Sequence, residues 1–431
     1  MRQVIVIGAG ASGMMAAVTA ARAGCKVIIL EHTARSGRKI EITGNGKCNF
    51  TNTRQELSCY HTQKPAYVKQ ILQQFTVEQT LEFFEDLGIV PKCKNGYYYP
   101  YSGQAQAVSQ ALRREAERLR VRFACNMRII NIKKEHMFCV ETESISLPEK
   151  QKKNIRCKSK EHSSEQSHSR YTYTADAVIL ATGSKAASFT GSDGSGYVLA
   201  EKLGHTIRKP LPALVQLQCT EKETALLAGL RAEGSVTLYI DGKPFEKEFG
   251  EIQFINNGLS GIPIFQISSH GARALAEGKQ VAVRVNFLSG TGWKSIPEQL
   301  EMRKRKLKHT AVSQFLCGLL HERAIKALCK KMDIKGNQPV ETLENSQWNQ
   351  LTELLQAWEF PITKTGSYDQ AQVCSGGVVF DQLEEGTLES RLLPGLYFAG
   401  EILDVDGICG GYNLQWAWTS GYVAGTKAAE G

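Results

Sequence analysis

The sequence has no apolar run that approaches the length of about 18 residues that a membrane-spanning helix needs, so no such helix is predicted. It also has no Cys-x-x-Cys pair. Its 12 cysteines are scattered singly, which argues against a zinc site or a disulfide framework and is typical of reduced cytoplasmic thiols. The apolar run at the N-terminus leads directly into Gly8 without a cleavage site, so we expect a strand there and not a signal peptide. We therefore expect a cytoplasmic protein without a metal site.

Acidic residues are scarce in two stretches, which together account for the net charge of +9. Residues 144–170 carry seven Lys and Arg against three Glu, and residues 300–335 carry ten against three acids. The first stretch is rich in Ser, Lys, Glu and His and has little to bury, so we expect a loop. Basic stretches of this kind often form only solvated surface, but they also suit an acidic partner such as RNA.

The hydrophobic pattern changes three times along the 431 residues, a length that suggests more than one domain. Residues 3–30 read as strand, helix and strand, which is a β-α-β unit. Short strands broken by glycines fill 205–288, a helical pattern fills 297–358, and strand, turn and helix return over 373–431. We predict an α/β protein in which a Rossmann-like domain built from both termini is interrupted by a β-rich module and a helical module. The expected boundaries are 1–189, 190–290, 291–360 and 361–431.

A glycine-rich turn joins the first strand to the first helix. Gly8-x-Gly10-x-x-Gly13 follows a buried strand, and Glu31 stands at the end of the next strand. Gly8 permits the tight turn, Gly10 lets the backbone approach a pyrophosphate, and Gly13 lets helix and sheet pack closely. The helix N-terminus attracts phosphates, and Glu31 suits an unphosphorylated ribose, as in FAD or NAD. The expected contacts are Gly8, Gly10, Ala11, Ser12, Gly13 and Glu31.

A second glycine-rich element near the C-terminus decides between these two dinucleotides. Residues 396–401 form an apolar strand ending in Gly-Glu, and the segment DVDGICGGYN then leads into an apolar helix. Such an element suits the ribityl chain and ring edge of a flavin, and an NAD-only dehydrogenase has no need of it. We therefore predict non-covalently bound FAD. The expected contacts are Gly400, Glu401, Asp406, Gly410, Gly411, Tyr412 and Asn413, together with Ala181, Thr182 and Gly183 after the strand 177–180.

The order of these motifs is similar to that of two-fingerprint flavoproteins of the glutathione-reductase class. The chain resembles the BaiN-like flavoprotein family more closely still. Members of that family are often labelled NAD(P)/FAD-dependent or aminoacetone-oxidase-like proteins. The shared segments are GRKIEITGNGKCNFTN (37–52), GSDGSGYVLAEKLGH (191–205), GLSGIPIFQIS (258–268) and LDVDGICGGYNLQWAWTSGYVAG (403–425). The chain departs from the family pattern at Lys47, at Ser184 and in the basic loop 144–170.

The resemblance implies further contacts to FAD. Ile129 would give the adenine a backbone contact, and Arg38 and Lys39 would offer cations to the diphosphate. Cys48 lies where related disulfide reductases carry a cysteine pair, but the next cysteine is Cys59. We therefore expect Cys48 to be a small residue packed near the flavin beside Asn49, and not part of a redox disulfide.

Three functions remain open from the sequence. The favoured one is an oxidoreductase that passes hydride from NAD(P)H through FAD to an activated C=C bond. That bond would belong to an enone or to a uracil-type ring, for which ribosomal RNA is one source. The second is a flavin oxidase of a small amine such as aminoacetone, which uses oxygen. The third is an RNA-binding flavoprotein whose FAD is mainly structural. Relatives in the resembled family are credited with dehydro-steroid reduction, dihydrouridine synthesis and aminoacetone oxidation.

The sequence has no clear motif for the electron donor or for the catalytic groups. No second strand, glycine turn and helix follow the first, so NAD(P)H would bind only transiently over the flavin. No histidine and acid stand together beside a fingerprint, so no catalytic residue is predicted. The substrate, whether a small molecule or RNA, and the oligomeric state are likewise not predicted.

Overall fold

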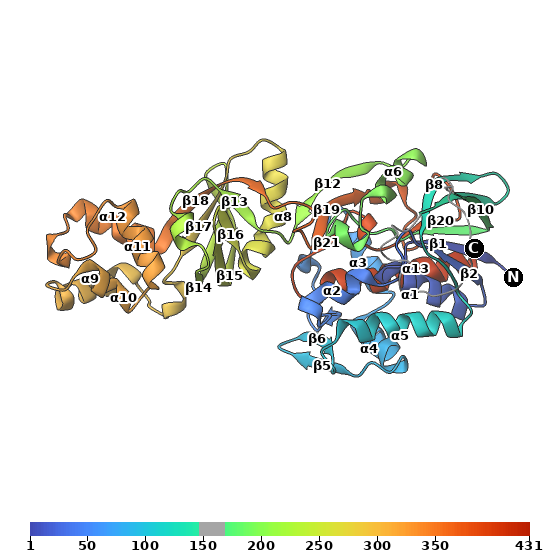
Figure 1. The fold of residues 1–431 in the computed structure, drawn as a ribbon, viewed down its shortest axis with the longest axis horizontal. Helices are drawn as coiled ribbons and strands as arrows, with labels where there is room; N and C mark the ends of the chain where they lie inside the picture. Colours follow the sequence, from blue (N-terminus) through green and yellow to red (C-terminus); the bar gives the residue numbers. More distant parts are fainter. Residues whose placement is uncertain (146–168) are drawn as a thin grey trace, which may run out of the picture. The chain divides into compact units, whose positions relative to one another are not determined.

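The computed structural model describes residues 1–145 and 169–431, so most of the predicted basic loop 144–170 lies outside the described residues. The chain forms two compact units. One unit combines Met1–Pro210 with Val373–Gly431 and contains both termini (Figure 1). The other unit is Leu211–Gln372.

A five-stranded parallel sheet forms the centre of the first unit. Its order is β20 (Leu396–Phe398), β11 (Ala177–Leu180), β1 (Gln3–Ile7), β2 (Lys26–Leu30) and β7 (Arg122–Ala124). All four neighbouring pairs run parallel. The C-terminal strand β20 thus lies in the same sheet as the N-terminal strand β1. This arrangement confirms the predicted Rossmann-like α/β domain built from both termini.

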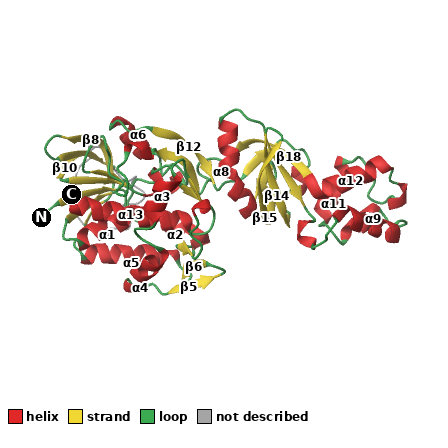
Figure 2. Cartoon of the chain, turned by 180° about the vertical axis from the view of Figure 1, so that it is seen from behind, coloured by secondary structure: helices red, strands yellow, loops and turns green. Residues whose placement is uncertain are grey.

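Alternation along β1 explains why both faces of this sheet are covered. Val4 and Val6 belong to an apolar cluster with the helices α1 (Ala11–Arg22), α5 (Ala105–Arg118) and α13 (Tyr412–Glu430). Ile5 and Ile7 belong to a second cluster that includes Phe138 of the three-stranded sheet. That sheet comprises β8 (Met127–Lys134), β9 (Phe138–Ser144) and β10 (Arg170–Ala175), and Figure 2 shows helices and strands as separate layers. Successive side chains of a strand point to opposite faces, so an apolar strand can serve two cores.

Helices α1 and α13 pack closely because glycines remove side chains from the contact. A Cβ atom on Gly421 would lie 2.4 Å from the carbonyl oxygen of Ser12, and one on Gly425 would lie 2.5 Å from that of Ala16. The backbones therefore approach to a distance that no larger residue permits. Over the described ranges, no helix is both long enough and apolar enough to cross a bilayer.

The first unit also contains smaller elements outside the central sheet. The helices among them are α2 (Arg38–Gly46), α3 (Pro65–Leu72), α4 (Val77–Asp86) and α6 (Ser195–Lys202). The strands are β3 (Thr51–Asn52), β5 (Pro91–Lys94) and β6 (Tyr97–Pro100) in one sheet, with β4 (Tyr60–His61) paired to β21 (Asp406–Gly407) and β12 (Ile207–Ala213) paired to β19 (Val373–Val378).

The second unit is a closed β-barrel joined to a group of helices. The barrel contains β13 (Leu217–Cys219), β16 (Gly258–Ser260), β15 (Lys243–Ile255), β14 (Arg231–Ile240), β17 (Val281–Asn286) and β18 (Trp358–Thr365), in that order. The helices are α7 (Thr224–Leu227), α8 (Ile262–Ala276), α9 (Ile296–Leu307), α10 (Val312–Cys317), α11 (Glu322–Lys331) and α12 (Asn345–Ala357). A single apolar cluster includes Val285 of the barrel and Phe315 and Trp348 of the helices.

The borders of the units differ from the boundaries expected from the sequence. The first unit extends to Pro210 and resumes at Val373, where the expected borders were 189/190 and 360/361. The first border is later because α6 and the pairing of β12 with β19 belong to the Rossmann unit. The second is later because β18 closes the barrel. The expected β-rich and helical modules form one unit, since they share one apolar cluster.

Candidate functional site

The turn between β1 and α1 is shaped by glycines of two kinds. Gly8 has φ +105°, and a Cβ atom there would lie 2.4 Å from the carbonyl oxygen of Ala181; a Cβ on Gly13 would lie 2.0 Å from that of Gly8. Gly10 is different, because no atom of the described residues beyond its chain neighbours lies within 4 Å of its Cβ position. Gly10 is also the N-cap of α1 and provides no side-chain cap, so the N–H groups of Ala11, Ser12 and Gly13 face this space. Open space before an uncapped helix N-terminus fits a diphosphate.

Glu31 ties the end of β2 to this turn. Its carboxylate accepts hydrogen bonds from the N–H of Ala9 at 2.7 Å and from that of Thr33 at 2.8 Å. The backbone carbonyl of Glu31 accepts a bond from Met127 N–H at 2.9 Å, which places the start of β8 beside it. β8 also carries Ile129. The residues predicted for the ribose and the adenine therefore lie on adjoining segments.

Two predicted cofactor residues carry polar atoms that the protein leaves unsatisfied. Thr182 Oγ1 and Asn49 Oδ1 are buried and have no hydrogen-bond partner within the described part of the chain. Thr182 follows β11, where Ala181 already adjoins Gly8 and where Gly183 turns the chain with φ +75°. Buried oxygens without partners are rare in folded proteins, so a ligand with N–H or O–H groups fits here. Together with the open glycine turn, these atoms fit an extended dinucleotide.

Glu401, in the 3-10 turn Gly400–Ile402 that follows β20, is held by two neighbours. Its Oε2 accepts hydrogen bonds from Lys39 Nζ at 2.7 Å and from Ser184 Oγ at 2.8 Å. Lys39, predicted to meet the diphosphate, therefore pairs with another predicted cofactor residue, and Arg38 donates to the carbonyl of Phe189 at 2.6 Å. Ser184, a departure from the resembled family, also joins this cluster. The ion pair fixes a carboxylate and an ammonium group side by side at the end of the central sheet.

The loop that leads into α13 is fixed by its own hydrogen bonds. The N–H and carbonyl of Gly407 bond the side-chain amide of Asn413, both at 2.8 Å. Asn52 donates to the carbonyl of Gly410 at 2.9 Å, and a Cβ on Gly411 would lie 2.7 Å from the carbonyl oxygen of Thr51. The segments around 49–52 and 406–413, predicted separately, are thus in contact. Tyr412 is buried at the start of α13.

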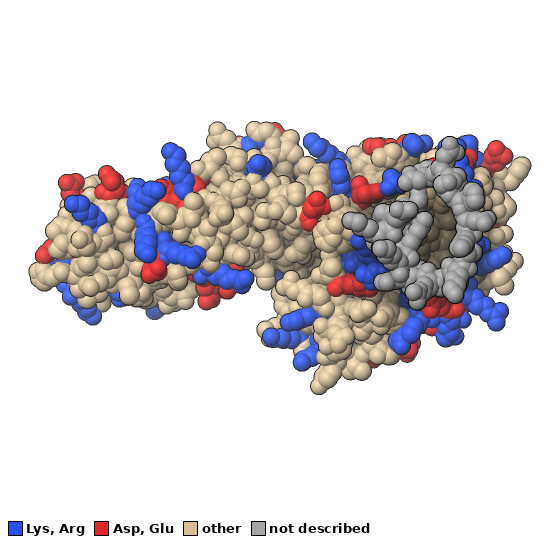
Figure 3. All heavy atoms as spheres, in the orientation of Figure 1, with Lys and Arg blue, Asp and Glu red and all other residues tan. Residues whose placement is uncertain are grey.

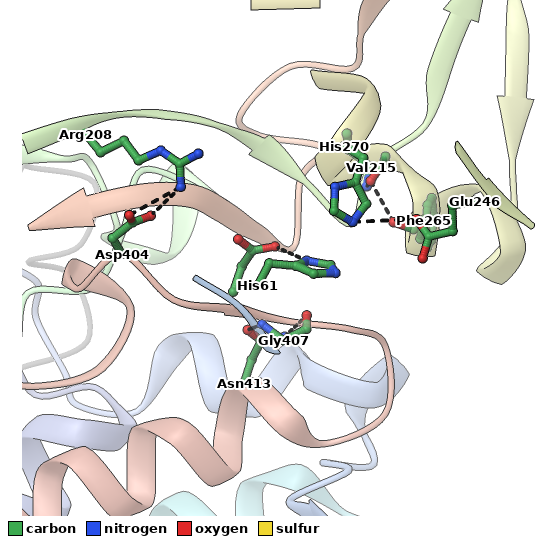
Figure 4. A network of polar contacts seen from close by, with 11 residues as sticks. His61, Arg208, Val215, Glu246, Phe265, His270, Asp404, Gly407 and Asn413 are labelled. Atoms are coloured by element: carbon green, nitrogen blue, oxygen red, sulfur yellow. Dashed lines mark hydrogen bonds and ion pairs between the residues drawn. The ribbon is translucent and has the colours of Figure 1, made fainter. Parts of the chain in front are cut away.

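A histidine that the sequence did not mark lies beside this loop, on β4. His61 Nδ1 is 2.9 Å from Asp406 Oδ2, and the two residues are direct partners in the β4–β21 pairing (Figure 4). Two residues earlier, Asp404 forms an ion pair with Arg208, whose guanidinium nitrogen lies 3.3 Å from Asp404 Oδ2. The expectation that no histidine and acid pair stands beside a fingerprint is therefore wrong. Only the pairing of segments 345 residues apart brings His61 to Asp406, and no local pattern indicates it.

Other histidines have structural roles. His205 is buried, its Nε2 lies 2.8 Å from Ser390 Oγ, and burial lowers its pKa to about 4. His321 caps α11 by accepting from Arg323 N–H. Within residues 1–145 and 169–431, no cluster of three or more His, Cys, Asp or Glu side chains could hold a metal ion.

Cys48 is fully buried, and burial raises the pKa of its thiol to about 12. Since the thiolate is the reactive form in disulfide exchange, Cys48 is poorly suited to carry electrons. We expect Cys48→Ser to keep flavin reduction within about tenfold of the parent, or about 1.4 kcal/mol of barrier. Anaerobic bleaching of the flavin measures this, with the exposed Cys317→Ser of the other unit as the control. A loss of several orders of magnitude with FAD still bound would contradict the expectation.

Known proteins are similar to this chain over nearly its whole length. The sequence profile of the HI0933-like protein Rossmann domain matches residues 2–427. A 3-dehydro-bile acid delta(4,6)-reductase from Clostridium scindens is 39% identical over 433 residues, and the match covers 100% of both chains. Ribosomal RNA dihydrouridine synthases from Escherichia coli and Haemophilus influenzae are 28% and 27% identical, over 97% of this chain and 96% of theirs. The family resemblance predicted from the motifs is confirmed, and the chain belongs to the HI0933-like family of Rossmann-domain proteins.

Proposed function

We propose that this protein is an FAD-dependent oxidoreductase that uses NAD(P)H to reduce an activated carbon–carbon double bond in a small conjugated enone. The observation that carries the proposal is the uncapped N-terminus of α1 behind the open space at Gly10, with Glu31 fixed beside it. The reductase from Clostridium scindens, which matches the whole chain, supports the choice of reaction and of an enone. Bound FAD supplies the two-electron hydride transfer.

The chain's own residues divide into three groups around the cofactor. The N–H groups at the start of α1 would hold the diphosphate with Arg38 and Lys39, and Glu31 and Ile129 would hold the adenosine. Thr182 Oγ1 and Asn49 Oδ1 would accept hydrogen bonds from the cofactor, since they have no described protein partner. Around the flavin end would stand Cys48, Ala181, Gly183, Gly400, Glu401, Asp406, Gly410, Gly411, Tyr412 and Asn413.

The remaining glycine-rich segment does not have the form of a second nucleotide-binding turn, which supports only transient binding of the reduced nicotinamide. Gly191–Gly196 follows a 3-10 turn, Ser188–Thr190, and not a strand. A nucleotide-binding turn normally joins a strand to a helix, so this segment is poorly suited to hold a second dinucleotide. An aromatic side chain beside the loop that leads into α13 is available to an apolar substrate, because the ring of Tyr97 adjoins Gly410 and is 39% exposed.

The test uses the protein as purified. Heat should release the flavin, and chromatography should identify it as FAD. FMN alone, or flavin that stays with the precipitated protein, would contradict the proposal. Anaerobic NADH or NADPH should bleach the flavin, and a 3-dehydro-Δ4,6 bile acid should then restore its colour. Bleaching by aminoacetone but not by either nicotinamide, with recovery only in oxygen, would support the amine oxidase in its place.

RNA remains the second candidate substrate, because of exposed cations on the helices of the second unit. Lys326 and Lys330 of α11 are exposed, as are Arg305 and Lys306 of α9. Several cations there have protein partners: Lys326 pairs with Glu322 at 3.2 Å, Lys331 pairs with Glu221 at 2.5 Å, and Arg303 donates to the carbonyl of Phe315 at 2.9 Å. Figure 3 shows acidic side chains among the basic ones. The relatives at 28% and 27% identity, which are dihydrouridine synthases of ribosomal RNA, also favour this candidate.

Salt dependence separates the two substrates. If RNA is bound through these helices, affinity for ribosomal RNA should fall steeply with salt. The double variant Lys326→Ala/Lys330→Ala should make the slope of the logarithm of the binding constant against the logarithm of the salt concentration shallower by about two. Lys243→Ala/Lys247→Ala on β15 is the matched control for lost charge. Equal, weak binding by all three proteins would leave the enone as the better substrate.

A further inference from the structure

His61 and Asp406 form a histidine–carboxylate pair in the first unit. Nδ1 and Oδ2 are 2.9 Å apart, the Asp406 side chain is 2% exposed, and that of His61 is 18% exposed. A buried carboxylate bonded to one ring nitrogen fixes the tautomer and the orientation of the imidazole. The ring therefore keeps contact with solvent while its acid is buried.

The segment that carries Asp406 is rigid. Asn413 bonds both backbone groups of Gly407, and Asn52 bonds the carbonyl of Gly410. The neighbouring acid, Asp404, lies against Arg208 at 3.3 Å and so has its own cation (Figure 4). Asp406 is the carboxylate within hydrogen-bond distance of His61 Nδ1. A fixed pair of this kind is suited to deliver a proton to a defined point.

Asp406 belongs to the loop that the proposed function places at the flavin end of the cofactor, and His61 lies beside it on β4. Other groups on these elements are less suited to donate a proton. Tyr60 is buried and donates its hydroxyl proton to Gln55 Oε1 at 2.6 Å, and burial raises its pKa. Burial and the adjoining Cys59 likewise raise the pKa of Tyr412. Imidazole is the side chain ordinarily suited to exchange a proton near neutral pH, and His61 supplies one beside these tyrosines.

We propose that His61, oriented by Asp406, is the proton donor in the reduction of the enone, an inference that rests on the proposed function. Hydride, which originates from the reduced nicotinamide, adds with its electron pair to the alkene carbon remote from the carbonyl. The π electrons of the C=C bond then form a new C–H bond at the carbon next to the carbonyl, using the proton on His61 Nε2. The imidazole regains a proton from water, and the double bond has gained one hydride and one proton.

The decisive variant is His61→Gln, with His309→Gln as the matched control. His309 Nδ1 is 2.7 Å from Glu341 Oε1, so it is also a histidine–carboxylate pair, but it is exposed and belongs to the second unit. We expect His61→Gln to keep FAD content, melting temperature and bleaching by NAD(P)H. Reoxidation of the reduced flavin by the enone should slow by about 100-fold or more, the usual effect of losing a general acid. The control should match the parent in every measurement.

A second pair of measurements does not depend on turnover. In D2O the oxidised parent should catalyse deuterium exchange at the carbon next to the carbonyl of the saturated ketone, and His61→Gln should not, although it binds that ketone with the same affinity. Asp406→Asn keeps His61 in place and should slow both reoxidation and exchange by about tenfold. It should also abolish the downfield proton resonance of the His61 Nδ1–H group, which the parent should show.

The outcomes separate the two proposals. A parent protein whose reduced flavin no enone reoxidises overturns the proposed function, and the role of His61 with it. An active parent with His61→Gln and Asp406→Asn both within threefold of it in reoxidation overturns the role of His61 alone. Loss of FAD or of the fold in His61→Gln, with normal reoxidation in Asp406→Asn, shows a structural histidine and also overturns it.

Discussion

Gly10→Val is expected to fold as well as the parent and to lose its flavin. In the part of the chain that the structure describes, no atom beyond its chain neighbours lies within 4 Å of the Cβ position of Gly10. Its φ of −81° is open to any residue, so these surroundings do not require glycine there. A side chain would instead fill the space before the helix N-terminus where the diphosphate is proposed to lie. We expect FAD affinity to fall by about 100-fold or more, which corresponds to about 2.7 kcal/mol.

Two measurements on the same sample check this prediction. Flavin content after gel filtration and titration of the apoprotein with FAD give the affinity, and the melting temperature of the apoprotein gives the stability. Gly290→Ala, in the second unit, is the control, because the nearest atom to its Cβ position is an ordinary 3.5 Å away. A Gly10→Val protein that binds FAD as tightly as the parent would show that the cofactor does not approach this turn.

Gly425→Leu is expected to destabilise the unit built from both termini. A Cβ there would lie 2.5 Å from the carbonyl oxygen of Ala16 and 3.0 Å from the Cβ of Thr19, both on α1. Since these atoms belong to a packed helix, α13 must move away, and the free energy of unfolding should fall by about 3 kcal/mol, at the upper end for overpacked cores. Flavin binding should weaken too, because Ser12 and Gly13 lie on α1.

Urea unfolding of the apoprotein measures this effect. Ala429→Leu is the control: it enlarges a half-buried residue one turn further along α13 and should change stability by no more than about 0.5 kcal/mol. A Gly425→Leu protein as stable as the parent would mean that α1 and α13 do not need their close approach. The N- and C-terminal parts of the unit would then be joined chiefly through the sheet.

The candidate cofactor site was largely predictable because its signals are local. Gly8, Gly10 and Gly13 stand within one turn and one helix start, and Glu31 ends the following strand, so sequence spacing alone places them together. The return of strand and helix after residue 373 likewise predicted that both termini share one domain, as the parallel pairing of β20 with β11 confirms. Their individual contacts to FAD remain proposals.

What the sequence by itself determined is the fold class and the family, because hydrophobic periodicity and glycine spacing act over a few residues. Tertiary structure decided the rest. The partners Lys39 and Glu401 are 362 residues apart, and His61 and Asp406 are 345 apart, so their meeting depends on which strands pair and which helices pack. The borders of the units also depended on long-range contacts, since the barrel and the helices that follow it share one apolar cluster. Whether a charged side chain is exposed or paired depends on its burial and on its neighbours in the fold, and a sequence pattern specifies neither.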